Sequence, residues 1–129
     1  MISMFRPKNV TRIVTGKKGE SVAADYLKKN GYEILGKNFR CPLGEIDMIA
    51  RDQEGLVFIE VKTRRSEDLG YPEEAVDMKK QKKISQLAAY YLQTKDLTNV
   101  QARFDVVAIT MSGRSMEVKL IKNAFDFIA

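Results

Sequence analysis

The sequence predicts one α/β domain in which helices pack on the faces of a mixed β-sheet. Two segments carry apolar residues at helical spacing, and five shorter segments have strand-like composition and are bounded by turn-forming residues. The order along the chain is α-β-β-β-α-β-β. Because helices and strands are interleaved, we expect a sheet flanked by helices. The length of 129 residues fits a single domain with its own core.

The N-terminal part is predicted to be an arm followed by a helix. Residues 1–15 contain Pro7 and show no clear period, so we expect a flexible basic arm ahead of a domain that spans 16–129. The helix is expected over about 17–30, and Asn30-Gly31 is a typical C-terminal stop. Its apolar stripe consists of Ala23, Ala24 and Leu27, with Val22 and Tyr26 beside it.

Three strands are expected to follow this helix. The first begins at residue 32 and extends to about 40, the second covers about 45–51, and the third covers 56–63. The segment 41–44 favours a turn, and 52–55 favours a hairpin turn. The second and third strands are therefore expected to pair with each other.

The middle of the chain is predicted to be a loop and then a second helix. Residues 64–72 are polar and include Gly70, which favours a loop. The helix is expected to begin at Glu73 or Val76 and to end at Gln93. Its inward stripe, at 3.6-residue spacing, consists of Ile84, Leu87, Ala88 and Tyr91.

Two further strands are predicted for the C-terminal part. Residues 102–110 contain two alternating sets of side chains, and residues 112–115 favour a turn into a last strand over 116–121. Residues 123–129 are expected to form a short helical end.

The composition indicates a globular protein, with 44% hydrophobic and 30% charged residues. No apolar run approaches the roughly 18–20 residues that a membrane-spanning helix needs. The N-terminus lacks the apolar core of a signal peptide. With Cys41 as its single cysteine, the chain cannot form an intramolecular disulfide or a cysteine zinc cluster. We therefore expect a cytoplasmic protein without membrane contact.

The absence of histidine restricts the chemistry that the chain can carry out. It excludes histidine general bases, Ser-His-Asp triads and His-ligated zinc. A hydrolytic metal site in this chain must use oxygen ligands, which suits Mg²⁺ or Mn²⁺. No small-molecule organic cofactor is expected.

The net charge of +5 comes largely from two groups of basic residues. The first group is Arg6, Lys8, Arg12, Lys17 and Lys18, and the second is Lys79, Lys80, Lys82 and Lys83. A basic balance is compatible with a polyanionic partner, because binding phosphates releases counterions. It is also compatible with a solvated basic surface, and composition alone leaves both interpretations open.

Acids on the second and third predicted strands are candidates for metal-assisted chemistry. Side chains alternate along a strand, so Glu60 and Lys62 share one face, and Glu45 and Asp47 share a face with Ile49. The hairpin is expected to bring Asp47 close to Glu60. A divalent cation would offset the cost of burying these carboxylates, and the lysine could hold a water or a phosphate. This is the minimal equipment for metal-assisted phosphodiester cleavage.

Glu20 is the candidate contributed by the first helix. It precedes Ala23 and Leu27 by three and seven residues, so it lies on the face that is expected to pack on the sheet. A helix N-terminus also favours negative charge, which gives Glu20 a second explanation without a site.

Each of these residues also has an interpretation without catalysis. Glu60 and Lys62 fit an exposed ion pair on a strand, and Asp47 fits a surface position. The spacing Asp-x12-Glu-x-Lys occurs by chance in many sequences. The context favours a site, because the acid-bearing hairpin follows a helix with an inward glutamate.

Five segments resemble the YraN-like family of bacterial proteins within the PD-(D/E)xK nuclease superfamily. They are Gly19-Glu20, Gly44-Glu45-Ile46-Asp47-Met48-Ile49-Ala50, Phe58-Ile59-Glu60-Val61-Lys62-Thr63-Arg64, Glu74-Ala75-Val76 and Lys80-Gln81-Lys82-Lys83. The resemblance covers about 16–125 and implies the restriction-endonuclease-like fold. Archaeal Holliday-junction resolvases share the layout. The chain departs from the superfamily name in having Ile46, where the name has proline, before Asp47.

The resemblance also implies roles for individual residues. Asp47 and Glu60 would be ligands of Mg²⁺ or Mn²⁺ together with the Val61 carbonyl, and Glu20 would complete the site directly or through water. Lys62 would orient the attacking water and stabilise charge on the phosphate. Nucleic-acid contacts would come from Arg64, Arg65, Lys79, Lys80, Gln81, Lys82 and Lys83.

The expected function is therefore that of a metal-dependent DNA endonuclease, with branched or structured DNA as the favoured substrate. A junction-cutting enzyme is expected to act as a homodimer, because two strands must be cut symmetrically. One alternative is a non-catalytic nucleic-acid-binding module that keeps the fold. Another is an interaction protein that uses its basic arm.

Overall fold

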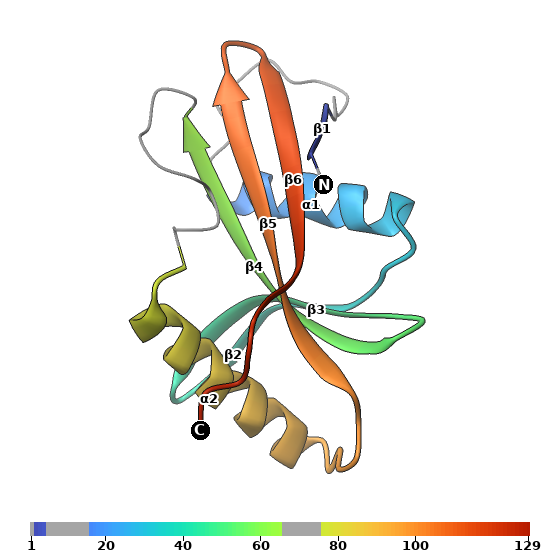
Figure 1. The fold of residues 1–129 in the computed structure, drawn as a ribbon, viewed down its shortest axis with the longest axis vertical. Helices are drawn as coiled ribbons and strands as arrows, with labels where there is room; N and C mark the ends of the chain where they lie inside the picture. The colour runs from blue at the N-terminus through green and yellow to red at the C-terminus, as the bar shows by residue number, and fades with distance from the viewer. Residues whose placement is uncertain (1, 5–15, 66–75) are drawn as a thin grey trace.

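The computed structural model describes residues 2–4, 16–65 and 76–129 and shows two helices and one six-stranded sheet (Figure 1). In chain order the elements are β1 (Ile2–Met4), α1 (Gly16–Lys29), β2 (Glu33–Cys41), β3 (Gly44–Asp52), β4 (Gly55–Arg65), α2 (Met78–Thr94), β5 (Ala102–Ser112) and β6 (Ser115–Phe125). The α/β class and the predicted order α-β-β-β-α-β-β are confirmed, with β1 as an additional strand ahead of them.

The sheet is mixed and has the strand order β1-β6-β5-β4-β3-β2. β4 and β5 run parallel to each other, whereas every other neighbouring pair is antiparallel. A parallel neighbour cannot be reached by a tight turn, so the chain crosses over through α2 between β4 and β5. The start of α2 lies near β4, since the Lys80 ammonium is 3.8 Å from the carboxylate of Glu60.

Two hydrophobic cores lie on opposite faces of the sheet, as the alternation of strand side chains requires. The α1-side core joins α1 residues such as Leu27 to Val57 and Ile59 of β4. The α2-side core joins α2 residues such as Leu87 to Phe58 of β4 and Phe104 of β5. The predicted inward stripes of both helices are confirmed: Ala23, Ala24 and Leu27 of α1 and Ile84, Leu87 and Ala88 of α2 are buried, and Tyr91 packs against the α2-side core.

The structure corrects two predictions about the C-terminal half. Arg64 and Arg65 belong to β4 rather than to a loop, because β4 stays paired with β5 as far as Arg65 and Met111. The short helical end predicted for 123–129 is wrong. Residues up to Phe125 belong to β6, and 126–129 have no regular secondary structure. The Phe125 ring stacks on Phe104 at 4.8 Å, which favours continued strand pairing at this point.

The beginnings of β1 and α2 also differ from the prediction. Residues 2–4, which were assigned to the arm, form β1 and pair with β6, whereas 5–15 lie outside the described residues. α2 begins at Met78, since Asp77 is extended and its carboxylate accepts a hydrogen bond from the Lys80 amide. A start at Glu73 likewise falls outside the described residues.

Gly55, at the β3–β4 turn, occupies a position that no other residue fits. Its φ is +138°, and a Cβ there would lie 2.6 Å from the Gln101 carbonyl oxygen, which accepts the Leu56 amide. We expect Gly55→Ala to lower the free energy of unfolding by about 2–3 kcal/mol, measured by urea titration. Gly36→Ala is the control, because no heavy atom lies within 4 Å of a Cβ at Gly36. Equal stability of the two variants would contradict this steric argument.

A buried polar network fixes the end of the sheet at the β3–β4 turn. The Asp105 carboxylate is fully buried and accepts hydrogen bonds from the Tyr32 hydroxyl, the Arg103 guanidinium and the Asn123 amide. Arg103 also donates to Asp52 at 2.6 Å. The network joins β3, β5, β6 and the residue before β2, so its charges are paired although they are largely removed from water.

No helix among the residues that the structure describes has the length and apolar character needed to cross a membrane.

Candidate metal centre and basic hollow

The candidate site lies at a fork in the sheet where β3 and β4 separate. The β3–β4 ladder ends at the pair Met48–Ile59. Beyond it, β3 remains paired only with β2, and β4 remains paired with β5. Asp47 and Glu60 are the first residues past the end of the ladder. The Asp47 carboxylate accepts the Val61 amide at 2.8 Å, so it replaces a strand partner at this point.

The fork coincides with an irregularity in the β2–β3 hairpin. Ile46 and Ile49 are three residues apart, yet both belong to the α2-side core, whereas Met48 belongs to the α1-side core. The alternation of β3 is therefore interrupted. The prediction that Glu45, Asp47 and Ile49 share one face is wrong, because Ile49 belongs to the α2-side core, whereas Glu45 and Asp47 converge with Glu20. On β2, Asn38 lies between the residues paired with Ile46 and Met48 and has a φ of 55°. Asparagine tolerates this left-handed conformation better than most residues.

Three carboxylates from the α1 side converge at the fork. One oxygen atom from each of Glu20, Glu45 and Asp47 lies within 4.8 Å of the others. Burial, and next the Asp47 charge, raise the pKa of Glu20, while a hydrogen bond from the Asn38 side chain opposes this rise. The predicted approach of Glu20 to Asp47 is thus present in the structure.

Glu45 belongs to this group, although it was not among the predicted site residues. The signal was available, since Glu45 and Asp47 are two residues apart on one strand. Glu45 also pairs with Arg40 at 3.1 Å across the hairpin. A surface ion pair of this kind does not prevent a role as a ligand.

Glu60 meets Asp47 from the other strand of the fork. It is 7% exposed, and its carboxyl group lies within hydrogen-bonding reach of the Asp47 carboxylate. Burial, and next the Asp47 charge, raise the pKa of Glu60 to about 8, and Lys80 and Lys62 oppose this rise. Two carboxylates this close favour a proton or a cation between them.

The donor set fits a hard divalent cation. The converging groups are carboxylates from α1, β3 and β4, and carboxylate oxygens are the ligands that Mg²⁺ and Mn²⁺ prefer. The charge of Asp47 raises the pKa of both Glu20 and Glu60, and a cation held among these acids would offset that repulsion. Asp47 belongs both to the group with Glu20 and Glu45 and to the pair with Glu60, so it is the centre of the candidate site.

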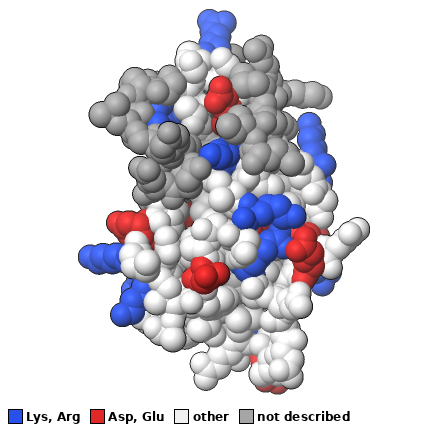
Figure 2. Space-filling model, viewed as in Figure 1, with Lys and Arg blue, Asp and Glu red and all other residues white. Residues whose placement is uncertain are grey.

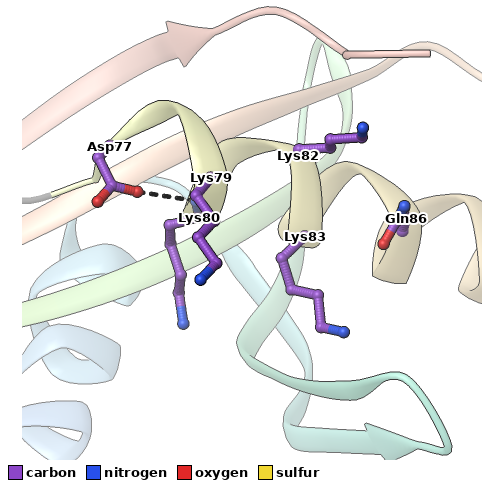
Figure 3. A pocket seen from close by; sticks show the side chains of 6 residues that line it. All are labelled: Asp77, Lys79, Lys80, Lys82, Lys83 and Gln86. Atoms are coloured by element: carbon purple, nitrogen blue, oxygen red, sulfur yellow. Dashed lines mark hydrogen bonds between the residues drawn. The ribbon is translucent and has the colours of Figure 1, made fainter.

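A basic hollow of about 500 Å³ lies beside the acids, at the start of α2. Its lining residues are Asp77, Lys79, Lys80, Lys82, Lys83 and Gln86 (Figure 3). Lys79, Lys80 and Lys83 extend to the same side of the helix, whereas Lys82 points away from them (Figure 3). Figure 2 shows basic side chains at the left margin, where α2 begins, while the face as a whole carries scattered charges of both signs. Four of the six lining residues are lysines, so the hollow itself is basic.

The other predicted nucleic-acid contacts lie in different settings. Arg64 and Arg65 are at the end of β4, beyond Lys62. The side-chain amide of Gln81 donates a hydrogen bond to the Val76 carbonyl at 3.0 Å, so it stabilises the start of α2. Nucleic-acid contact by these residues stays a prediction.

Sequence comparisons show relatives that are about half identical to this chain over most of its length. A UPF0102 protein of Syntrophus aciditrophicus is 52% identical over 87% of this chain and 88% of its own length. UPF0102 proteins of Caldicellulosiruptor saccharolyticus and Clostridium botulinum are 49% and 50% identical, covering 85% and 86% of this chain and 95% and 93% of their own lengths.

Among solved structures, the chain is similar to EndoMS in an EndoMS–dsDNA2 complex, at 17% identity and a TM-score of 0.46. This similarity covers 85% of the present chain and 44% of EndoMS. The model of the uncharacterised protein family UPF0102 matches residues 19–109, which contain all the acids of the fork. The matched segment and the relatives agree with the resemblance to YraN-like proteins, and the chain belongs to the family UPF0102.

Proposed function

We propose that the protein is a Mg²⁺- or Mn²⁺-dependent nuclease that hydrolyses phosphodiester bonds in DNA. The observation that carries the proposal is the meeting of Asp47 and Glu60 at the fork, beside the basic hollow. A strand fork explains why two acids occupy positions that would otherwise hold apolar residues. The neighbouring lysines supply a place for a phosphate.

Each acid has a role in this proposal. Asp47, Glu60 and the Val61 carbonyl would hold the cation, and Glu20 and Glu45 would complete its shell directly or through water. A cation held there would lower the pKa of a bound water and neutralise charge on the phosphoryl oxygens. Lys62, two residues beyond Glu60, would orient the attacking water and stabilise the charge that develops on the phosphate.

The substrate proposal follows the charges around the site. A hollow lined by lysines favours contact with the sugar-phosphate backbone, which carries no sequence information. Branched or structured DNA remains the favoured substrate by resemblance to the resolvases, and a homodimer would supply two cuts. Arg64 and Arg65 would contact the backbone beyond the site.

The test compares wild type, Glu60→Gln and Glu117→Gln on single-stranded, duplex, flap and four-way-junction DNA with Mg²⁺ or Mn²⁺. We expect wild type to cleave at least one substrate and Glu60→Gln to be slower by at least about 100-fold, because the variant loses a charged ligand. Glu117→Gln makes the same chemical change at an exposed position of β6 and should retain full activity.

Two outcomes would contradict the proposal. If wild type cleaves nothing, the protein is not a nuclease, and retained salt-dependent binding would favour a non-catalytic DNA-binding module. If Glu60→Gln cleaves as fast as wild type, the assigned residues are not the site.

A further inference from the structure

We propose that Lys80 has two alternative partners: the Glu60 carboxylate in the metal-free protein and a phosphate oxygen of the substrate in the metal-loaded protein. This inference rests on the proposed function and assigns Lys80 a place in the same site. It goes beyond a general contact with the DNA backbone, because it links cation binding to the capture of the phosphate.

The first step is the position of the Lys80 ammonium between solvent and the acids. Its Nζ atom lies 3.8 Å from Oε1 of Glu60. The side chain of Lys80 is 41% exposed, whereas that of Glu60 is 8% exposed. Lys80 therefore reaches from the open hollow to a carboxylate that is nearly closed to water. Of the two lysines near Glu60, Lys80 has the larger opposing effect on its pKa, ahead of Lys62.

The start of α2 holds the backbone of Lys80 in place. The Lys80 amide donates to the Asp77 carboxylate at 2.9 Å, and the next amide, of Gln81, donates to the Asp77 carbonyl at 2.8 Å. The Gln81 side chain donates to Val76 on the other side of the cap. With its backbone fixed in the first turn, Lys80 can change partners by side-chain rotation alone. The helix N-terminus adds further positive potential there.

The hollow supplies the second partner. Lys79 and Lys83 extend to the same side of α2 as Lys80, one and three residues away (Figure 3). Successive residues rise by about 1.5 Å along a helix, so Lys83 lies only about 4.5 Å further along the axis than Lys80, and a phosphate in the hollow would meet more than one ammonium group. Lys80 is the member of this row that also contacts the acids.

The two partners compete for one ammonium group. In the metal-free protein, Lys80 balances part of the negative charge that Glu60 shares with Asp47. With a divalent cation held by Glu60, Lys80 loses this anionic partner and is repelled by the cation, and a phosphate oxygen in the hollow is the next anion within its reach. The site therefore binds the cation less tightly than it would without Lys80, and gains a preformed contact for the substrate.

The experiment measures Mn²⁺ affinity without DNA, and cleavage, for wild type, Lys80→Gln and Lys80→Arg. We expect Lys80→Gln to bind Mn²⁺ about five-fold more tightly, because a competing charge is removed, and to cleave at least about 30-fold more slowly at saturating Mn²⁺. Lys80→Arg should recover most of the cleavage rate. Lys28→Gln, an exposed change of the same charge on α1, should match wild type in both measurements.

The two measurements separate this inference from the proposed function. Unchanged Mn²⁺ affinity in Lys80→Gln overturns the competition at Glu60, and unchanged cleavage overturns the phosphate contact, although the nuclease assignment stands in both cases. A wild-type protein that binds Mn²⁺ but cleaves nothing overturns the nuclease assignment and the phosphate contact together. Tighter Mn²⁺ binding by Lys80→Gln would still support the ion-pair half of the inference.

Discussion

Asp47→Asn is expected to weaken Mn²⁺ binding and slow DNA cleavage strongly while leaving the metal-free fold at least as stable as wild type. Asp47 raises the pKa of both Glu20 and Glu60, so its negative charge destabilises the other acids of the fork. In wild type the Asp47 carboxylate accepts a hydrogen bond from the Val61 amide at 2.8 Å. Asparagine keeps an oxygen that can accept the same hydrogen bond. The substitution thus removes the charge and keeps the contact that closes the end of the β3–β4 ladder.

The expected sizes follow from the loss of one shared ligand. Mn²⁺ affinity and the cleavage rate should each fall by at least about 100-fold, and the free energy of unfolding should rise by about 1 kcal/mol. Titration calorimetry measures the Mn²⁺ affinity. Urea unfolding in the presence of a metal chelator measures the stability of the metal-free protein. Asp25→Asn, an exposed change on α1, is the control. A loss of more than about 2 kcal/mol in Asp47→Asn would mean that the carboxylate holds the fork together, and wild-type Mn²⁺ affinity would mean that Asp47 is not a ligand.

The elements that sequence reasoning predicted well are those with a local period. The apolar stripes of α1 and α2 follow helical spacing, and strands β2 to β4 are bounded by turn residues. Both signals are local in the sequence, so these elements can be predicted without knowing which distant residues they contact. β1 has only three residues and pairs with β6, which is more than a hundred residues away. No local signal identifies such a strand.

The site was predictable in part for the same reason. The hairpin and the inward face of α1 were sufficient to bring Glu20, Asp47 and Glu60 toward one region of the sheet. The fork was not predictable, because it depends on the left-handed Asn38 and on where the β3–β4 ladder stops. Strict alternation of side chains therefore failed on β3 beside the fork, where Ile46 and Met48 belong to opposite cores although they are two residues apart.

The buried network at the other end of the sheet was missed altogether. The alternation predicted for residues 102–110 gave no indication that the Asp105 carboxylate is buried. Its partner Tyr32 lies 73 residues earlier in the chain. Arg103, two residues before Asp105 on the same strand, was the available signal, because an i, i+2 pair of opposite charges shares a face.

Asp105→Ala is expected to be the most destabilising substitution outside the cores, at a cost of about 3–5 kcal/mol. It leaves the Tyr32 hydroxyl and the Asn123 amide without their acceptor. It also leaves Arg103, whose side chain is 12% exposed, with one of its two close carboxylates. Urea unfolding measures the loss, and Asp25→Ala should stay within about 0.5 kcal/mol of wild type.

The same network predicts a pH dependence that the metal centre does not share. Hydrogen bonds from Arg103 hold the pKa of Asp52 below its ordinary value of 3.8. A depressed pKa means that the folded protein binds this proton less readily than the unfolded chain, so the stabilisation is present above pH 3.8 and is lost as the pH falls through the folded pKa. Arg103→Met should remove this acid-dependent loss and leave Mn²⁺ affinity unchanged, because Arg103 bonds to the network and not to the fork. A change in Mn²⁺ affinity in that variant would show that the two ends of the sheet are coupled, and the separation between a structural network and a functional site would be wrong.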